Sequence, residues 1–153
     1  MFPLLEEVRE VVELPLVAAE GIGAGRAMAA ALTAGADAVR VGTRFVAASE
    51  SIAHPVYVEA LIASRAEDTV VTTAFGDGWP DAPHRVLKSC LDAGHALGSA
   101  QSWGPNWPTA DDEGPVEARA LYAGPSVGAV HSRQAASEIV AELVGEAEAL
   151  LMH

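Results

Sequence analysis

The order of elements at the start of the chain constrains the fold more than any other feature. The apolar run 14–19 predicts a strand covered on both faces, because continuous apolar runs are typical of buried parallel strands. A short helix is predicted over 26–33, ending near Gly35, and a second strand over 38–46. A strand, a helix and a strand in this order predict parallel neighbours joined by a right-handed crossover. The chain is therefore expected to belong to the α/β class.

Glycine-rich turns accompany both predicted strands. Gly21 and Gly23 come after the first strand, and Gly42 lies with Thr43 within the second. Glycine lets backbone N–H groups approach an anion without an obstructing Cβ, and the helix that starts near residue 25 adds the positive end of its dipole. In β/α barrels, the loops after strands 7 and 8 often form a phosphate site of this kind. The alternative is that these glycines only form tight turns. A dinucleotide fingerprint does not fit, because the third glycine of 21–25 falls one position early.

The remainder of the chain predicts mostly helices. The predicted elements are helices over 4–12, 56–66, 84–92 (closed by Gly94) and 134–152, a third strand over 69–75 and an irregular loop over 101–115. We therefore predict an α/β fold that contains the C-terminal part of a TIM (β/α) barrel, its last two strands. Residues 1–66 form this partial barrel with its phosphate-binding turns, and residues 67–153 form a mainly helical C-terminal extension.

Two strands cannot close a barrel, which needs about eight. The open sides of both strands would present unpaired backbone and apolar surface. The chain of 153 residues is therefore expected to pair with another copy of itself, with a separate N-terminal half, or with the remainder of a longer protein.

Composition excludes several classes of partner and site. The net charge of −12 argues against nucleic acid, since phosphate contacts need clustered Lys and Arg. No apolar run approaches the ~20 residues that span a bilayer. Cys90 is the sole cysteine, and with five scattered histidines it gives no metal-ligand spacing. We expect a cytoplasmic protein without a metal site.

Five segments, taken in order, resemble the C-terminal half of the nitronate monooxygenase family, formerly called 2-nitropropane dioxygenases. These segments are 14–23 (LPLVAAEGIG), 42–45 (GTRF), 50–55 (ESIAHP), 77–87 (DGWPDAPHRVL) and 121–124 (LYAG). The resemblance covers nearly the entire chain. It implies a flavin-dependent TIM barrel that oxidises alkyl nitronates with FMN and molecular oxygen. A related flavin-dependent enoyl reductase shares the same two glycine turns.

The resemblance also implies a cofactor site. Gly21, Gly42 and Thr43 would hold the FMN phosphate, while Ile22 and Gly23 shape the first turn. Two further positions match a family segment near the cofactor, and Glu20 stands in the first turn itself. The predicted cofactor-binding residues are Glu20, Gly21, Ile22, Gly23, Gly42, Thr43, Gly124 and Ser126. Arg26, Arg40 and Arg44 lie near this site, and an ordinary ion pair is expected for Arg44.

The sequence departs from the family in two respects. The family has two consecutive glycines in the first turn, and here Glu20 replaces the first, which places a carboxylate beside the expected phosphate. The segment that carries the family's catalytic base has no counterpart here, so no catalytic residue is assigned. The alternatives to an enzyme are a non-catalytic remnant, a phosphate- or flavin-binding module, and a subunit that completes a barrel with a separate N-terminal half.

Overall fold

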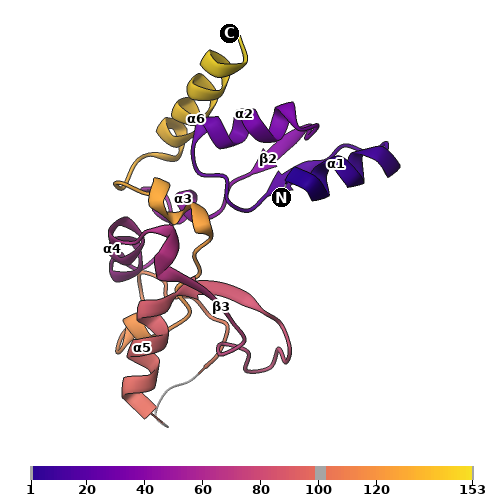
Figure 1. Ribbon diagram of the computed structural model, residues 1–153. Coiled ribbons are helices and arrows are strands. Elements are labelled where there is room, and N and C mark those ends of the chain that lie inside the picture. Colours follow the sequence, from indigo (N-terminus) through magenta and orange to yellow (C-terminus); the bar gives the residue numbers. More distant parts are fainter. Residues whose placement is uncertain (1, 99–102, 153) are drawn as a thin grey trace.

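The computed structural model describes residues 2–98 and 103–152 (Figure 1). These residues form an α/β fold with two separate two-stranded sheets. In chain order the elements are α1 (Phe2–Val11), β1 (Val17–Ala19), α2 (Gly25–Thr33), β2 (Ala38–Arg40), α3 (Thr43–Val46), α4 (Pro55–Ala63), η1 (Ala66–Asp68), β3 (Thr69–Thr72), β4 (His84–Leu87), α5 (Lys88–Leu97), η3 (Val116–Ala118), η4 (Pro125–Ala129) and α6 (Ala136–Leu151).

The predicted strand–helix–strand unit is confirmed. β1 and β2 are parallel, with Val17 opposite Ala38. Helix α2 links them and ends where expected, because Gly35 has φ +99°. The N–H of Gly35 donates to the carbonyl of Leu32 at 3.1 Å, and the N–H of Ala36 donates to the carbonyl of Ala31 at 3.0 Å. These paired bonds form the Schellman motif, which satisfies the last carbonyls of a helix.

The second strand is shorter than predicted. The sequence predicts a strand over 38–46, yet β2 ends at Arg40 and 43–46 forms helix α3. The chain turns at Gly42, whose carbonyl accepts a hydrogen bond from the N–H of Phe45 at 2.9 Å. The apolar residues after Gly42 therefore lie in a helical turn and not in a strand. An apolar run this short does not distinguish a helix from a strand.

The prediction of a helix over 84–92 is wrong in its first half. His84–Leu87 forms β4, which pairs antiparallel with β3, so that Val86 lies opposite Val70. Helix α5 then runs to Leu97 and passes through Gly94, which does not close it. A Cβ at Gly94 would lie 2.6 Å from the Trp103 ring. Close packing against this indole, not helix termination, explains the glycine.

The other predicted helices and strands are confirmed, although their ends differ by up to three residues. The helices predicted over 4–12 and 56–66 correspond to α1 and α4. A third strand within 69–75 is confirmed as β3, and the helix within 134–152 is confirmed as α6. Of the predicted loop over 101–115, positions 101 and 102 lie outside the described residues. The described part, 103–115, contains no helix or strand. The division of the chain at residue 66 stays a prediction.

Apolar packing places α6 against the strand–helix–strand unit. Figure 1 shows α6 lying along α2 at one end of the molecule, with α5 at the other end. The approach of α6 to α2 is close, since a Cβ at Gly25 would lie 2.2 Å from the Cβ of Glu146 and 2.7 Å from the carbonyl oxygen of Leu143. The largest buried cluster instead joins α4, β4 and α5 with the segment 120–130.

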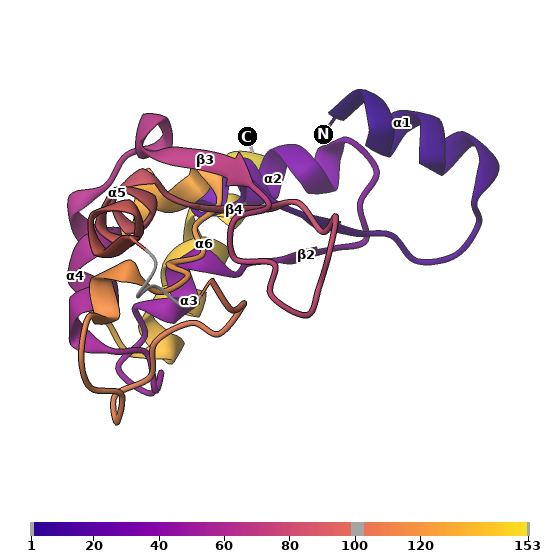
Figure 2. The same cartoon turned by 90° about the horizontal axis from the view of Figure 1, so that it is seen from below.

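Helix α1 extends from one side of the molecule, as Figure 2 shows. Its Leu5 is buried, and its Arg9 donates to the carbonyl of Gly35 at 2.9 Å and forms an ion pair with Asp37. Other apolar side chains of this region are uncovered. The large apolar side chains exposed on α1, on β1 and on the segment between them are Phe2, Leu4, Val11, Leu14 and Val17.

Candidate functional site

Three turns meet at one pocket of about 240 Å³. The first turn follows β1, the second lies between β2 and α3, and the third leads into η4. The pocket brings together every residue of the predicted cofactor site except Gly23. Its lining residues are Ala19, Glu20, Gly21, Ile22, Arg40, Gly42, Thr43, Gly124 and Ser126.

Backbone donors surround this pocket. Gly21 has φ +72°, in the left-handed region that favours glycine. Within residues 2–98 and 103–152, the N–H groups of Gly21, Ile22 and Gly42 donate to no protein acceptor. A Cβ at Gly21 or Gly42 would meet no atom within 4 Å, so the backbone is accessible on that side. Unpaired N–H groups gathered in turns are the donors by which proteins bind phosphate.

Thr43 connects the second and third turns. Its Oγ1 accepts a hydrogen bond from the N–H of Gly124 at 2.9 Å. Because this contact uses a lone pair of the hydroxyl, the O–H hydrogen stays free to donate. Thr43 is also the first residue of α3, and the first N–H groups of a helix have no partner within it. One residue thus offers two donors to the pocket.

Gly23 has a packing role beneath the pocket. A Cβ at this position would lie 2.9 Å from the Cβ of Ala129 and 3.0 Å from the Cβ of Ser126. These are distances that real Cβ atoms do not tolerate unless a neighbour moves. Glycine therefore allows the first turn to lie directly against η4, which agrees with its predicted role in shaping that turn.

The expectation that the α2 dipole contributes to the pocket is wrong. The N–H of Gly25, at the start of α2, donates to Oε2 of Glu146 at 2.6 Å. A carboxylate from α6 therefore already neutralises this helix end. Neither Ala24 nor Gly25 lines the pocket. The donors of this pocket are the turns themselves.

Two charged residues of opposite sign line the pocket. Glu20 has φ +72°, an uncommon conformation for a residue with a Cβ. Arg40 is exposed at the end of β2, opposite Ala19, and its side chain forms no ion pair or hydrogen bond in the described chain. Arg40 was expected to lie near the site, with no contact assigned to it. The register of β1 and β2 sets Arg40 opposite Ala19, and both residues line the pocket.

Arg44 has the structural role expected of it. It forms an ion pair with Glu142 of α6 and donates to the carbonyl of Gly23 at 3.0 Å. It does not line the phosphate pocket.

Among the residues that the structure describes, there is neither a cluster of metal ligands nor a helix that could span a membrane. No group of three or more His, Cys, Asp or Glu side chains lies close enough together to hold a metal ion. None of the described helices has the length and apolar character needed to cross a bilayer.

The chain is similar to one protein family and to several solved structures. The family model described as "Nitronate monooxygenase" matches residues 1–146. A probable nitronate monooxygenase of Staphylococcus aureus (strain JH9) is 40% identical over 72 residues, which are 47% of this chain and 20% of that protein.

Two solved structures match almost the whole chain. FabK from Thermotoga maritima superimposes with a TM-score of 0.79 at 31% identity, covering 99% of this chain and 50% of that one. A nitroalkane oxidase from Streptomyces ansochromogenes superimposes with a TM-score of 0.74 at 30% identity, covering 99% of this chain and 44% of that one.

The chain spans about half the length of these structures, or less, and a fifth of the curated relative. Its α/β fold corresponds to part of a larger TIM-barrel structure. The assignment to the last two strands of that barrel stays a prediction. The family uses FMN, and its substrates are nitronates and molecular oxygen. On the match over residues 1–146, this chain belongs to the nitronate monooxygenase family.

Proposed function

We propose that this chain forms the phosphate-binding part of an FMN site in an oxidoreductase that acts on alkyl nitronates with molecular oxygen. One observation carries the proposal. The turns after β1 and β2, which the sequence separates by a helix, meet the 124–126 segment at a single pocket. Three backbone N–H groups of its lining residues, those of Gly21, Ile22 and Gly42, have no protein acceptor among the described residues.

The residues fit a phosphate by number and by type. Three backbone N–H groups, those of Gly21, Ile22 and Gly42, would hold its oxygens, together with the free hydroxyl hydrogen of Thr43. Arg40 would supply a positive charge at the rim. Hydrogen bonds between a charged acceptor and preorganised N–H donors are stronger than neutral ones.

When bound, FMN supplies the redox chemistry, and the protein residues hold and orient it. No residue of the chain is assigned to proton abstraction. We propose that the catalytic base belongs to the part of the barrel that this chain does not match in its longer relatives. The activity therefore depends on that part.

The exposed apolar surface on α1 and β1 indicates that another polypeptide segment binds there. The exposed apolar residues Leu4 and Val17 line a groove of about 210 Å³ between α1 and β1. We propose that further barrel strands cover this surface, supplied by an N-terminal half or by another copy of the chain. Sedimentation velocity on the wild type and on Val17→Glu tests this proposal. A wild-type homo-oligomer that the substitution dissociates would support self-association. A wild-type monomer that binds an N-terminal half would support complementation.

One observation favours a second candidate, a binding module without catalysis. Glu20 places a carboxylate at the pocket, where repulsion would weaken phosphate binding. An enoyl reductase-like enzyme is the alternative within the enzyme class, and the similarity to FabK is as high as that to the nitroalkane oxidase. Turnover assays on the completed barrel separate the three candidates. Turnover of nitronates supports the first enzyme, turnover of enoyl substrates supports the reductase, and turnover of neither supports the binding module.

Equilibrium titration with FMN and with riboflavin tests the proposed function. Riboflavin lacks the phosphate, so a phosphate site predicts tighter binding of FMN. Thr43→Val removes the hydroxyl and should weaken FMN binding about tenfold or more, since a hydrogen bond to a charged group contributes about 1.5–3 kcal/mol. Thr43→Ser keeps the hydroxyl and is the matched control. Equal affinity of wild type for FMN and riboflavin would refute the phosphate site.

A further inference from the structure

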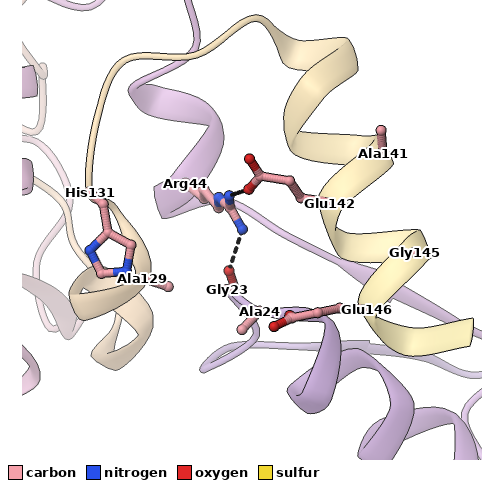
Figure 3. A pocket seen from close by; sticks show the side chains of 9 residues that line it. All are labelled: Gly23, Ala24, Arg44, Ala129, His131, Ala141, Glu142, Gly145 and Glu146. Carbon is pink, nitrogen blue, oxygen red and sulfur yellow. Dashed lines mark hydrogen bonds and ion pairs between the residues drawn. The ribbon is translucent and has the colours of Figure 1, made fainter. Parts of the chain in front are cut away.

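A second groove, of about 470 Å³, lies on the other side of the first turn (Figure 3). Its walls come from that turn, from Arg44 of α3 and from Glu142 and Glu146 of α6. We propose that the two α6 carboxylates are positioning residues: they clamp the turn after β1 so that its N–H groups stay directed at the phosphate pocket. This inference rests on the proposed function and assigns α6 a role in it.

The first arm of the clamp acts through Arg44. Figure 3 shows its guanidinium between the carbonyl of Gly23 and the carboxylate of Glu142. Its Nη1 donates to the Gly23 carbonyl at 3.0 Å, and its Nη2 donates to Oε1 of Gln134 at 3.3 Å. Arg44 follows Thr43 directly in α3. The hydrogen bond from Arg44 therefore connects the first turn to α3, and the second turn lies at the start of that helix.

Glu142 holds that arginine in place. The Arg44 side chain is only 11% exposed, whereas that of Glu142 is 51% exposed. A buried guanidinium without a carboxylate partner is unfavourable, so the ion pair fixes its position. The hydrogen bond from Gln134 and the contact with Arg44 lower the pKa of Glu142, so the carboxylate stays charged at neutral pH.

The second arm is Glu146, one helical turn further along α6. Its Oε2 accepts a hydrogen bond from the N–H of Gly25 at 2.6 Å. Residues four apart lie on the same face of a helix, so Glu142 and Glu146 face the turn together. One arm fixes the carbonyl of Gly23 and the other fixes the N–H of Gly25. Ile22, which lines the phosphate pocket and whose N–H has no acceptor among the described residues, immediately precedes this clamped segment.

Three alanine variants on α6 test the clamp. Glu142→Ala and Glu146→Ala each remove one arm. Glu148→Ala removes the same charge from an exposed position of the same helix and is the matched control. Each is titrated with FMN and riboflavin, and backbone amide order parameters are measured by NMR for residues 21–25 without ligand.

We expect the preference for FMN over riboflavin to fall about tenfold in the first two variants, the order typical of residues that position a ligand-binding group. It should not change in Glu148→Ala. The order parameters of 21–25 should fall in the same two variants, while those of α2 and α6 stay at the wild-type level. Equal losses of FMN and riboflavin affinity would indicate a merely structural role and overturn the inference. Unchanged order parameters in both clamp variants would also overturn it.

The wild-type titration keeps the two proposals apart. A wild type without preference for FMN refutes the proposed function, and with it any positioning role of α6 toward phosphate. A wild type that prefers FMN, with a preference that the clamp variants leave intact, refutes the clamp alone.

Discussion

Replacement of Glu20 by glycine is predicted to tighten FMN binding with little change in stability. Glu20 has φ +72°, and a residue with a Cβ costs about 1–2 kcal/mol there relative to glycine. Glycine in turn adds about 0.4–1 kcal/mol of conformational entropy to the unfolded chain. The two effects oppose each other. The free energy of unfolding should therefore rise by about 0–1.6 kcal/mol.

The larger effect should be electrostatic. Glu20 lines the pocket proposed to hold a phosphate. Two unit charges about 4 Å apart in water repel by about 1 kcal/mol, and a dianion about doubles that figure. About 1–2 kcal/mol corresponds to an affinity gain of about fivefold to thirtyfold. Because Arg40 lines the same pocket, removal of Glu20 also leaves its positive charge unopposed.

Titration with FMN at low and at high salt measures this gain. Glu20→Gln removes the charge and keeps the Cβ, so it should reproduce the affinity gain without the change in stability. Asp81→Gly is the matched backbone control, since Asp81 also has a positive φ (58°) and does not line the pocket. Salt should reduce the gain through screening. Wild-type FMN affinity in Glu20→Gln, or an equal gain for riboflavin, would refute the reasoning.

Three further predictions concern packing, reactivity and pH. Gly25→Ala places a methyl 2.2 Å from a side-chain atom of α6 and should lower the free energy of unfolding by about 1–3 kcal/mol, measured by denaturant titration; wild-type stability would contradict the close packing of α2 on α6. Cys90 is fully buried, and burial raises the pKa of its thiol to about 11, so a thiol reagent at pH 8 should modify it only at the rate of unfolding; fast modification of the folded chain would contradict its burial. Hydrogen bonds from Thr109 and the ion pair with Arg119 lower the pKa of Asp112 below 3.8, so its stabilising effect is present above that value and is lost as pH falls through the lowered pKa. Asp112→Asn should therefore melt below wild type at pH 7, and the two melting temperatures should converge in acid; a constant difference across this range would contradict the pKa shift.

Local patterns in the sequence were sufficient to predict the strand–helix–strand unit. The apolar run before Glu20 and the glycine after α2 predict a strand and a helix end from neighbouring residues alone. Both signals depend on the backbone within a few residues. For this reason the Schellman motif at Gly35 appears where the sequence placed it.

The errors arose where distant contacts decide the structure. Residues 84–87 become a strand because they pair with β3, which lies earlier in the chain and outside the segment itself, and a helical pattern does not reveal that partner. Gly94 was predicted to end a helix, but glycine is needed there because the Trp103 ring leaves no room for a Cβ. Tertiary contacts override local propensity in both cases.

The same distinction applies to the candidate site. Glycine spacing predicted the turns, and the family resemblance added Gly124 and Ser126, which line the same pocket. Arg40 becomes recognisable as a lining residue only through the strand register. The carboxylates of α6 reach the first turn from more than a hundred residues away, so no local pattern indicates them.

If the turns after β1 and β2 hold the phosphate of FMN, their backbone amides should respond to FMN and not to riboflavin. Amide chemical-shift mapping of the ¹⁵N-labelled chain measures this response, with the two ligands titrated in parallel. We predict that the shifts specific to FMN are largest at Gly21, Ile22, Gly42 and Thr43. FMN-specific shifts centred elsewhere, or none at ligand concentrations that saturate the protein, would contradict the account.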